Sequence, residues 1–273
     1  MNVNLRQRII TGLILLFLFL SFLFYSPGTA QAVFVIIMLA MIYEFCSISL
    51  AGVTSAFTYV FTAVLGSIAL IILVVYRWSD GQYILIVNSL SVIYILINSI
   101  YLLTRKKSFL PKIPLIQCFL YITFPLLVLL FWLKDFENAQ VHLFAIFAMI
   151  WISDIAAYFV GKSFGKHKLF KAVSPKKTWE GFFGGGVFTI IAATIISILI
   201  PSLALIHWLI IGFIVWIVGS LGDLVESSFK RHYKIKDSGT ILPGHGGFLD
   251  RLDSFIFAVP VVLLYLKLFV YAS

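Results

Sequence analysis

The sequence predicts an all-α, polytopic integral membrane protein with about nine transmembrane helices. Hydrophobic residues make up 62% of the 273 positions and charged residues only 11%, whereas a soluble domain typically carries about 25% charged residues. The mean hydropathy is +1.08. Apolar runs close to 20 residues recur along the whole chain, and about 20 residues are needed for a helix to cross roughly 30 Å of hydrocarbon. This composition excludes a soluble globular domain and a disordered chain.

Nine apolar runs are candidate spans. They lie near 9–25, 30–50, 56–76, 84–103, 115–133, 141–160, 181–200, 203–221 and 254–272. The first run follows Arg6 and Arg8, as a signal peptide would, but no small-residue cleavage site follows it, so we interpret it as a retained helix. Cys46 and Cys118 stand alone in apolar stretches, which argues against a disulfide framework or a zinc site.

Basic residues predict the orientation of these spans. With a cytoplasmic N-terminus, 17 of the 20 Lys and Arg residues fall in or beside cytoplasmic segments, as the positive-inside bias requires. We therefore expect the N-terminus and the active site to face the cytoplasm and the C-terminus to lie on the opposite side. The expected location is the inner membrane of a bacterial cell.

Acidic residues divide the chain into two parts. Seven of the 11 Asp and Glu residues follow residue 150, in or beside the last two large cytoplasmic segments. Carboxylates interleaved with Lys, Arg, Gly and His are what metal ions and polyphosphates require together. Within a single membrane domain, we interpret residues 1–140 as scaffold helices and residues 141–273 as the catalytic region.

Two acidic residues fall within the predicted spans. Asp154 lies in the sixth, where a carboxylate is expensive unless it faces a polar cavity or a cation, or pairs with a basic side chain that holds helices together. Glu44 is a weaker functional candidate, because it lies near the inner end of its span, where a side chain can reach the interface.

The segment between the sixth and seventh spans carries six lysines. Its GKS sequence is not a phosphate loop, since Ala156 holds a position where that motif needs glycine and the stretch lies within a span. In SPKKTWEG, Ser174 suits a helix cap and Pro175 a first helical position, which would place Lys176 and Lys177 beside helix-start amides that favour anions. The following GFFGGG predicts a small-residue face for close helix packing.

The stretch from 219 to 253 carries the strongest signal. Asp223 and Glu226 are three residues apart, and Asp250 and Asp253 repeat this spacing, so each pair shares a helix face and the four carboxylates could converge on a divalent metal. Several basic residues between the pairs could contact phosphate, and the glycines beside His245 allow close approach of backbone amides to an anion.

These residues also resemble the signature of the phosphatidate cytidylyltransferases, or CDP-diacylglycerol synthases. The stretch SSFKRHYKIKDSGTILPGHGGFLDRLDS matches the family pattern, and GDLVES, SPKKTWEG and WISDIAAYFVG support it. The motif match covers about the last 125 residues. The resemblance implies a multi-helix membrane enzyme, often dimeric, that condenses CTP with phosphatidate, releases pyrophosphate and uses Mg²⁺, with room for a second cation, monovalent or divalent.

Site roles follow from the motifs and the resemblance together. The expected metal ligands are Asp223, Asp250 and Asp253, with Asp154 as a ligand or a supporting group. The expected catalytic set adds His245, Lys230 and Arg231, with His245 as a phosphate donor or an orienting group. The expected substrate-binding residues are Lys176, Lys177, Ser228, Lys236, Asp237, Gly246, Gly247 and Arg251. The expected partners are CTP, phosphatidate and membrane lipid, with no nucleic acid.

Three alternatives stay open at this point. A CTP-dependent lipid kinase, such as a polyprenol kinase, could use a similar site but would transfer the γ-phosphate to an alcohol. A CDP-alcohol phosphotransferase is disfavoured, since its own acidic motif is absent. A transporter would explain Asp154, but its site should lie near the midplane between repeats, and the sequence has no internal repeat.

Overall fold

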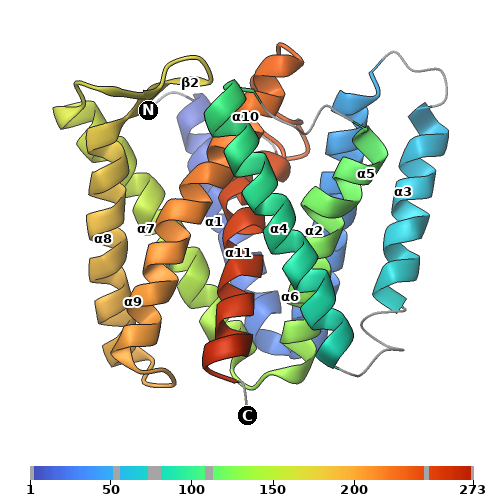
Figure 1. Cartoon of the computed structure of the whole chain (residues 1–273), viewed down its shortest axis with the longest axis horizontal. Helices are drawn as coiled ribbons and strands as arrows, with labels where there is room; N and C mark the ends of the chain where they lie inside the picture. The colour runs from blue at the N-terminus through green and yellow to red at the C-terminus, as the bar shows by residue number, and fades with distance from the viewer. Residues whose placement is uncertain (1–2, 52–55, 73–80, 108–112, 243–245, 272–273) are drawn as a thin grey trace.

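The computed structural model describes residues 3–51, 56–72, 81–107, 113–242 and 246–271, which form a bundle of long helices with one small β-hairpin (Figure 1). In chain order the elements are α1 (Val3–Tyr25), α2 (Pro27–Ser49), α3 (Ala56–Ile71), α4 (Gly81–Arg105), α5 (Pro114–Cys118), η2 (Phe119–Thr123), α6 (Phe124–Asp135), α7 (Ala139–Phe164), β1 (Lys168–Phe170), β2 (Ser174–Thr178), α8 (Trp179–Leu199), α9 (Leu205–Ile214), η3 (Val215–Gly219), α10 (Ser220–His232) and α11 (Leu249–Phe269).

Among the described residues, seven helices are long and apolar enough to cross a membrane, which confirms a polytopic membrane protein. They are Pro27–Ser49, Tyr83–Arg105, Pro114–Asp135, Ala139–Phe164, Trp179–Leu199, Leu205–His232 and Leu249–Phe269. The first and third of the nine expected spans correspond to shorter apolar helices, Gly12–Tyr25 and Phe57–Ile71. The expected eighth span is longer than its apolar run, because the helix continues through η3 and α10 to His232.

Helix α11 lies at the centre of the bundle and packs against α10, η3, α6 and α4 (Figure 1). Most of its side chains are buried although the helix is not amphipathic, as expected of a helix surrounded by other helices. The rings of Phe147 and Phe255 stack with centroids 4.3 Å apart, and Phe34 stacks on Phe255 at 5.9 Å. These rings join α2, α7 and α11 into one core.

Helices α7 and α8 pack more closely than any other pair, and the expected small-residue face makes this possible. A Cβ atom on Gly184 would come within 2.7 Å of the Val160 side chain, and one on Gly185 within 3.0 Å of the Ser153 carbonyl oxygen. Glycine at these positions lets the two backbones approach, as in other membrane helix pairs.

The hairpin of β1 and β2 connects α7 to α8, and its antiparallel register pairs Lys168 with Thr178. The expected helix start at Ser174 and Pro175 is wrong, because these residues belong to β2. The helix begins at Trp179 instead, and Thr178 is its N-cap, accepting a hydrogen bond from the Gly181 N–H at 3.2 Å. A capping threonine was therefore available four residues beyond the serine that the sequence suggested.

The two ends of the bundle differ in charge. One end, here called the hairpin end, carries β1, β2, the start of α1 and the segment between α10 and α11 (Figure 1). The described lysines from Lys162 to Lys177 and from Lys230 to Lys236 lie at this end, whereas Lys134 and Lys267 lie near the other. Helix α11 ends at that opposite end, so α1 begins and α11 ends at opposite ends of the bundle (Figure 1).

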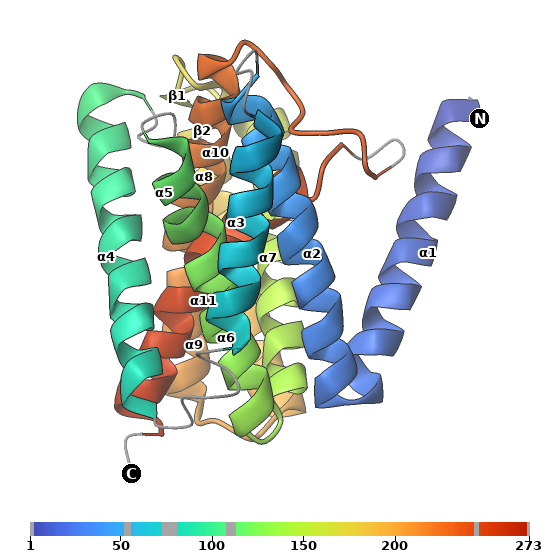
Figure 2. The ribbon, with the colours of Figure 1, turned by 90° about the vertical axis from the view of Figure 1, so that its right-hand side faces the viewer.

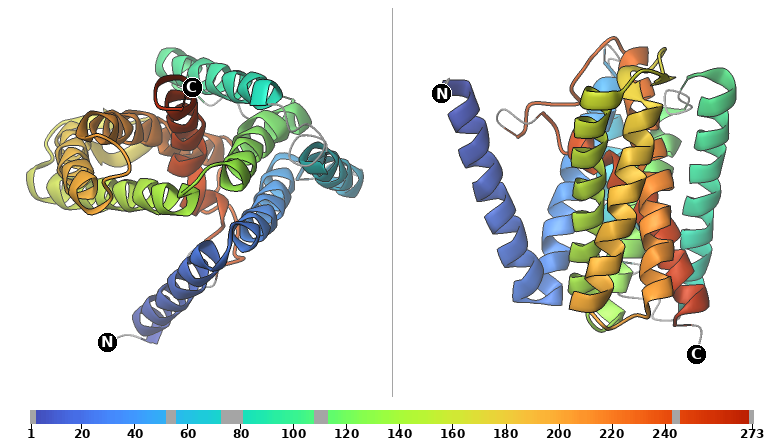
Figure 3. Two further views of the ribbon diagram at one scale, coloured as in Figure 1. Left: turned by 90° about the horizontal axis from the view of Figure 1, so that it is seen from below. Right: turned by 90° about the vertical axis from the view of Figure 1, so that its left-hand side faces the viewer.

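Helix α1 packs on the bundle through its C-terminal part, where the rings of Phe19 and Phe147 of α7 lie with centroids 5.1 Å apart. It is joined to α2 at the end opposite the hairpin and diverges from it toward the hairpin end (Figures 2 and 3). The connection is tight, since the Ser26 side chain caps α2 by accepting from the Thr29 N–H at 3.1 Å, and Pro27 occupies the first turn.

Candidate active site

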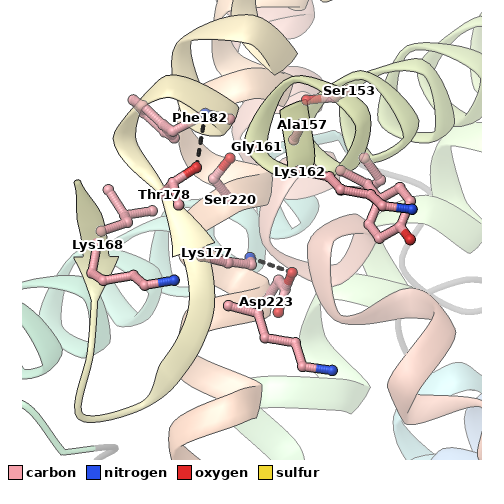
Figure 4. A pocket seen from close by; sticks show the side chains of 15 residues that line it. Ser153, Ala157, Gly161, Lys162, Lys168, Lys177, Thr178, Phe182, Ser220 and Asp223 are labelled. Atoms are coloured by element: carbon pink, nitrogen blue, oxygen red, sulfur yellow. Dashed lines mark hydrogen bonds and ion pairs between the residues drawn. The ribbon is translucent and has the colours of Figure 1, made fainter. Parts of the chain in front are cut away.

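A cavity of about 530 Å³ opens at the hairpin end between α7, the hairpin, α8 and the start of α10. Its wall combines carboxylates, lysines and small residues. Among them are four residues expected from the sequence, which are Asp154, Lys176, Lys177 and Asp223. The structure thus brings together residues from three separate segments of the chain, as Figure 4 shows.

Lys177 reaches from β2 to the Asp223 carboxylate on α10 and forms an ion pair with it (Figure 4). The Lys177 side chain is 30% exposed and that of Asp223 is 27% exposed, so water and solutes reach the pair. Asp223 also accepts a hydrogen bond from the Ser227 hydroxyl at 3.2 Å, which fixes its orientation on the helix face.

The carboxylates around Lys177 raise the pKa of its amine. Burial lowers the pKa of the Lys177 amine, but the Asp223 carboxylate outweighs that effect, so the pKa is raised above its usual value. Asp253 and Asp154 add to the increase in pKa. We call Lys177, Asp223, Asp154 and Asp253 the cavity cluster; its single ammonium group lies among three carboxyl groups.

A second lysine lies among carboxylates one turn further along the same face of α10. The Lys230 Nζ atom is 2.6 Å from Glu226 Oε2 and 2.6 Å from Asp250 Oδ1. The side chains of Lys230, Glu226 and Asp250 are only 11%, 0% and 9% exposed, so we call them the buried cluster. The two carboxylate pairs expected to converge on one site are therefore split, with Asp223 and Asp253 in one cluster and Glu226 and Asp250 in the other.

The second oxygen of Asp250 holds the segment between α10 and α11. It accepts hydrogen bonds from the Ser238 N–H at 2.8 Å and the Gly247 N–H at 2.9 Å. Gly246 has φ +86°, a conformation that favours glycine, and a Cβ there would lie 2.7 Å from the same oxygen. The glycines expected to let amides approach a bound anion thus approach the protein's own carboxylate.

Glu44 has a structural role at the same place. Its buried carboxylate accepts hydrogen bonds from the Ser238 hydroxyl at 3.1 Å, the Phe248 N–H at 3.0 Å and the Leu249 N–H at 2.9 Å. The last two amides begin α11, where helix N–H groups lack partners within the helix and favour negative charge. Glu44 of α2 therefore caps α11.

The other expected site residues lie outside the cavity wall. Arg231 donates to the Ile235 carbonyl oxygen at 2.8 Å and closes the end of α10, whereas Ser228 is buried within that helix. Lys236 and Asp237 are exposed in the following segment, and Arg251 is exposed on the first turn of α11. His245 lies outside the described residues.

The cavity also contains residues that the sequence analysis did not single out. Lys162 and Lys168 line it, together with Tyr158, Ser153 and Ser220. The Lys162 Nζ atom lies 5.8 Å from the centroid of the Tyr158 ring. A signal was present, because both lysines belong to the six-lysine segment, but choosing among six lysines needed the hairpin, which sets the side chains that face the cavity.

Carboxylate oxygens are suitable ligands for a divalent cation, but the carboxylates that the structure describes do not form a ready-made metal site. Within the residues that the structure describes, no three His, Cys, Asp or Glu side chains stand close enough together to hold a metal ion. The cavity cluster has more carboxylates than ammonium groups, which is an environment for a hard cation. In the buried cluster both Asp250 oxygens are already engaged.

The sequence is similar to those of several known phosphatidate cytidylyltransferases. The phosphatidate cytidylyltransferase of Bacillus subtilis (strain 168) is 50% identical over 129 residues, and that of Staphylococcus saprophyticus is 50% identical over 127. These alignments cover 47% and 46% of this chain, which spans about half (48%) of the length of each relative. The phosphatidate cytidylyltransferase of Staphylococcus haemolyticus is 32% identical over 262 residues, covering 94% of this chain and 97% of that protein.

A sequence model of the cytidylyltransferase family matches residues 6–269, which is nearly the whole chain. The match runs through every described helix, including those that contribute nothing to the cavity wall. This chain therefore belongs to the cytidylyltransferase family.

Proposed function

We propose that this protein transfers a cytidylyl group from CTP to phosphatidate, giving CDP-diacylglycerol and pyrophosphate. The family and the names of the relatives support this activity. The observation that carries it is the cavity at one end of a membrane bundle, in which lysines of the hairpin face carboxylates of α7 and α10. A cavity at the end of a membrane bundle is open to a soluble nucleotide from the water side and lies at the membrane depth of a lipid phosphate.

The chemistry brings two anions together. A phosphatidate oxygen attacks the α-phosphorus of CTP, a new P–O bond forms, and the bond from the α-phosphorus to the bridging oxygen breaks as pyrophosphate leaves with the electron pair. The attacking phosphate is already ionised, so the reaction needs charge compensation and alignment more than a general base. Lys162, Lys168 and Lys176 line the cavity where they can offset the charge of the triphosphate.

We further propose that Mg²⁺ is required and that Asp223, Asp253 and Asp154 would supply ligands to it, which requires these carboxylates to come closer together than they stand in the described structure. A bound Mg²⁺ would neutralise phosphate charge and orient the triphosphate. In this proposal Lys177 exchanges its contact with Asp223 for a contact with substrate phosphate. A ligand role for Asp250 would require it to leave Lys230. A second cation, monovalent or divalent, stays a prediction.

Orientation and assembly are also proposals. The basic hairpin end should face the cytoplasm of a bacterial cell, with the site accessible to cytoplasmic CTP, and α11 should end on the opposite side of the inner membrane. Homodimer formation and the lack of a nucleic-acid partner stay predictions.

The decisive experiment uses purified full-length protein, phosphatidate and CTP carrying a radiolabel on either the α- or the γ-phosphate, with and without Mg²⁺. The proposal expects the α-label in the lipid product, the γ-label in pyrophosphate, and no product after chelation of divalent metal. In a parallel reaction that contains polyprenol as the acceptor, transfer of the γ-label to the lipid alcohol would instead show a lipid kinase. Product formation in the presence of chelator would contradict the Mg²⁺ requirement but would still support cytidylyl transfer.

A further inference from the structure

A second cavity lies between α1, α2, α7 and the start of α11, in the space that α1 leaves where it diverges from α2 (Figures 2 and 3). It is a groove of about 400 Å³ with almost entirely apolar walls, open to the outside of the bundle. Its lining includes Leu16 of α1, Ile36 of α2, Trp151 of α7 and Leu252 of α11. The one charged side chain among its lining residues is Arg251, on the first turn of α11 at the hairpin end.

The groove has the length of one membrane leaflet. Gly12 and Phe22 of α1 both line it, and ten residues of helix rise about 15 Å, which is half of the roughly 30 Å hydrocarbon thickness. An acyl chain that starts at headgroup depth covers this distance. A helix of the same length, about 10 to 12 Å across with its side chains, would need about 1,200 Å³ or more, which is about three times the groove volume.

The first turn of α11 lies between the groove and the active-site cavity. Arg251 and Leu252 line the groove, whereas the next residue, Asp253, attracts the Lys177 ammonium group electrostatically and belongs to the cavity cluster. On α7, Trp151 lines the groove and Asp154 lines the cavity. A phosphate beside Arg251 would therefore lie about one helix width from the carboxylates and lysines of the site.

We propose that this groove binds an acyl chain of phosphatidate, with the lipid phosphate at Arg251, and so delivers the lipid substrate to the cavity from the side of α1. The assignment rests on the proposed function for the identity of the lipid. The apolar walls match the acyl chain, the length matches one leaflet, and the guanidinium group at the headgroup end matches the anionic phosphate.

The test uses full-length protein in detergent micelles and a phosphatidate whose acyl chain carries a photoactivatable diazirine. Irradiation should label peptides of α1, α2 and α11, as mapped by mass spectrometry, and unlabelled phosphatidate should compete. Ile36→Trp, which fills the groove, should lower labelling at least about fivefold. Val187→Trp on the exposed face of α8 is the matched control, since Val187 is 58% exposed and Ile36 is 65% exposed, and it should leave labelling unchanged.

Further variants make the result unambiguous. Leu16→Trp fills the groove from α1 and replaces Ile36→Trp if the latter does not fold. Arg251→Gln should weaken labelling by phosphatidate but not by a phosphatidylcholine probe, which has no net charge. Equal labelling of all lipid-facing helices, or no change in any groove variant, would overturn the proposal. So would a disulfide between two copies of an Ile36→Cys variant, since a second chain would then occupy the groove.

Labelling needs no turnover, so it separates this inference from the proposed function. Groove-specific labelling in a protein that makes no CDP-diacylglycerol would support the groove and contradict the function. Normal turnover with labelling spread over all helices would support the function and contradict the groove.

Discussion

Two lysines of this protein pair with carboxylates on successive turns of one face of α10, Asp223 and Glu226, and their surroundings differ. Lys177 and its partner Asp223 are about 30% exposed and border the cavity, whereas Lys230 lies between Glu226 and Asp250 with almost no access to solvent. The residue types are the same, but the environments allow different functions.

The comparison shows that access to solvent decides what an ion pair can do. In a solvated pair the attraction is weak and the partners can be exchanged for a substrate or a metal ion. In a buried pair, loss of one partner leaves a charge without compensation in a medium of low dielectric constant. The cavity cluster is therefore suited to catalysis, and the buried cluster to holding α10, α11 and the segment between them in place.

The largest expected effect is on stability. Lys230→Met leaves the Glu226 and Asp250 carboxylates buried without a cation and should lower the free energy of unfolding by about 3 to 5 kcal/mol. Lys177→Met, the same change in the cavity cluster, should lower it by at most about 1 kcal/mol, because water reaches its partner. Unfolding in detergent, followed by tryptophan fluorescence, measures both. Equal losses would show that the two clusters do not differ as described.

The next effect is on turnover. Asp223→Asn and Asp253→Asn keep side-chain volume but remove charge from the cavity cluster, so each should lower kcat about 100-fold or more and alter the Mg²⁺ dependence, with stability close to wild type. Asp250→Asn should act mainly on stability, since both oxygens of Asp250 have protein partners. Kinetics across a Mg²⁺ series distinguishes them. If folded Asp250→Asn protein loses turnover as strongly as Asp253→Asn, Asp250 belongs to the metal site after all.

A smaller effect is expected at the cap of α11. Glu44→Gln keeps the shape but weakens the acceptor for the Phe248 and Leu249 amides, and should lower the free energy of unfolding by about 1 to 3 kcal/mol. Thermal unfolding in detergent measures the loss, and Glu137→Gln, on an exposed glutamate, is the control. If unfolding is unchanged while the KM for CTP rises, Glu44 serves the substrate and not the helix.

The smallest effect concerns the hairpin that carries Lys168 and Lys177. Glu180 on the first turn of α8 is 2.7 Å from the His167 ring nitrogen and also accepts from the His167 backbone N–H at 3.2 Å. Because the contact is largely exposed, Glu180→Gln should raise the KM for CTP by no more than about fivefold and leave kcat near wild type. Initial-rate kinetics is the measurement. A large fall in kcat would mean that Glu180 does more than position the hairpin.

Much of this fold could be predicted from the sequence, because membrane spans depend on length and apolarity alone. Seven of the nine expected spans coincide with helices long and apolar enough to cross a membrane, and the first and third fall on the shorter apolar helices of α1 and α3. The residues of the cavity wall belong to the part from 141 to 273. The exposed Asp154 side chain at the cavity illustrates the rule that an acid within a span faces a polar space.

The split of the carboxylates could not be predicted in the same way. A spacing of three places Asp223 and Glu226 on neighbouring positions of one helix face, but their partners come from β2 and α11, which the spacing does not describe. Glu44 is a similar case, since its hydrogen bonds reach residues about 200 positions away in the chain. Only tertiary packing decides which of these acids remains accessible.

The π-helical segment η3 has a consequence for the register of the chain. Val215–Gly219 lies between α9 and α10 in one continuous helix, and a π turn accommodates an additional residue that an α-helix does not. Removing one residue there would rotate everything beyond it by about 100° relative to α9. Asp223 would then turn away from the cavity while every residue type in the candidate site stayed the same. The phase of the helix is thus as much a part of this candidate site as its carboxylates, and a single-residue deletion would change the phase without altering any side chain of the site.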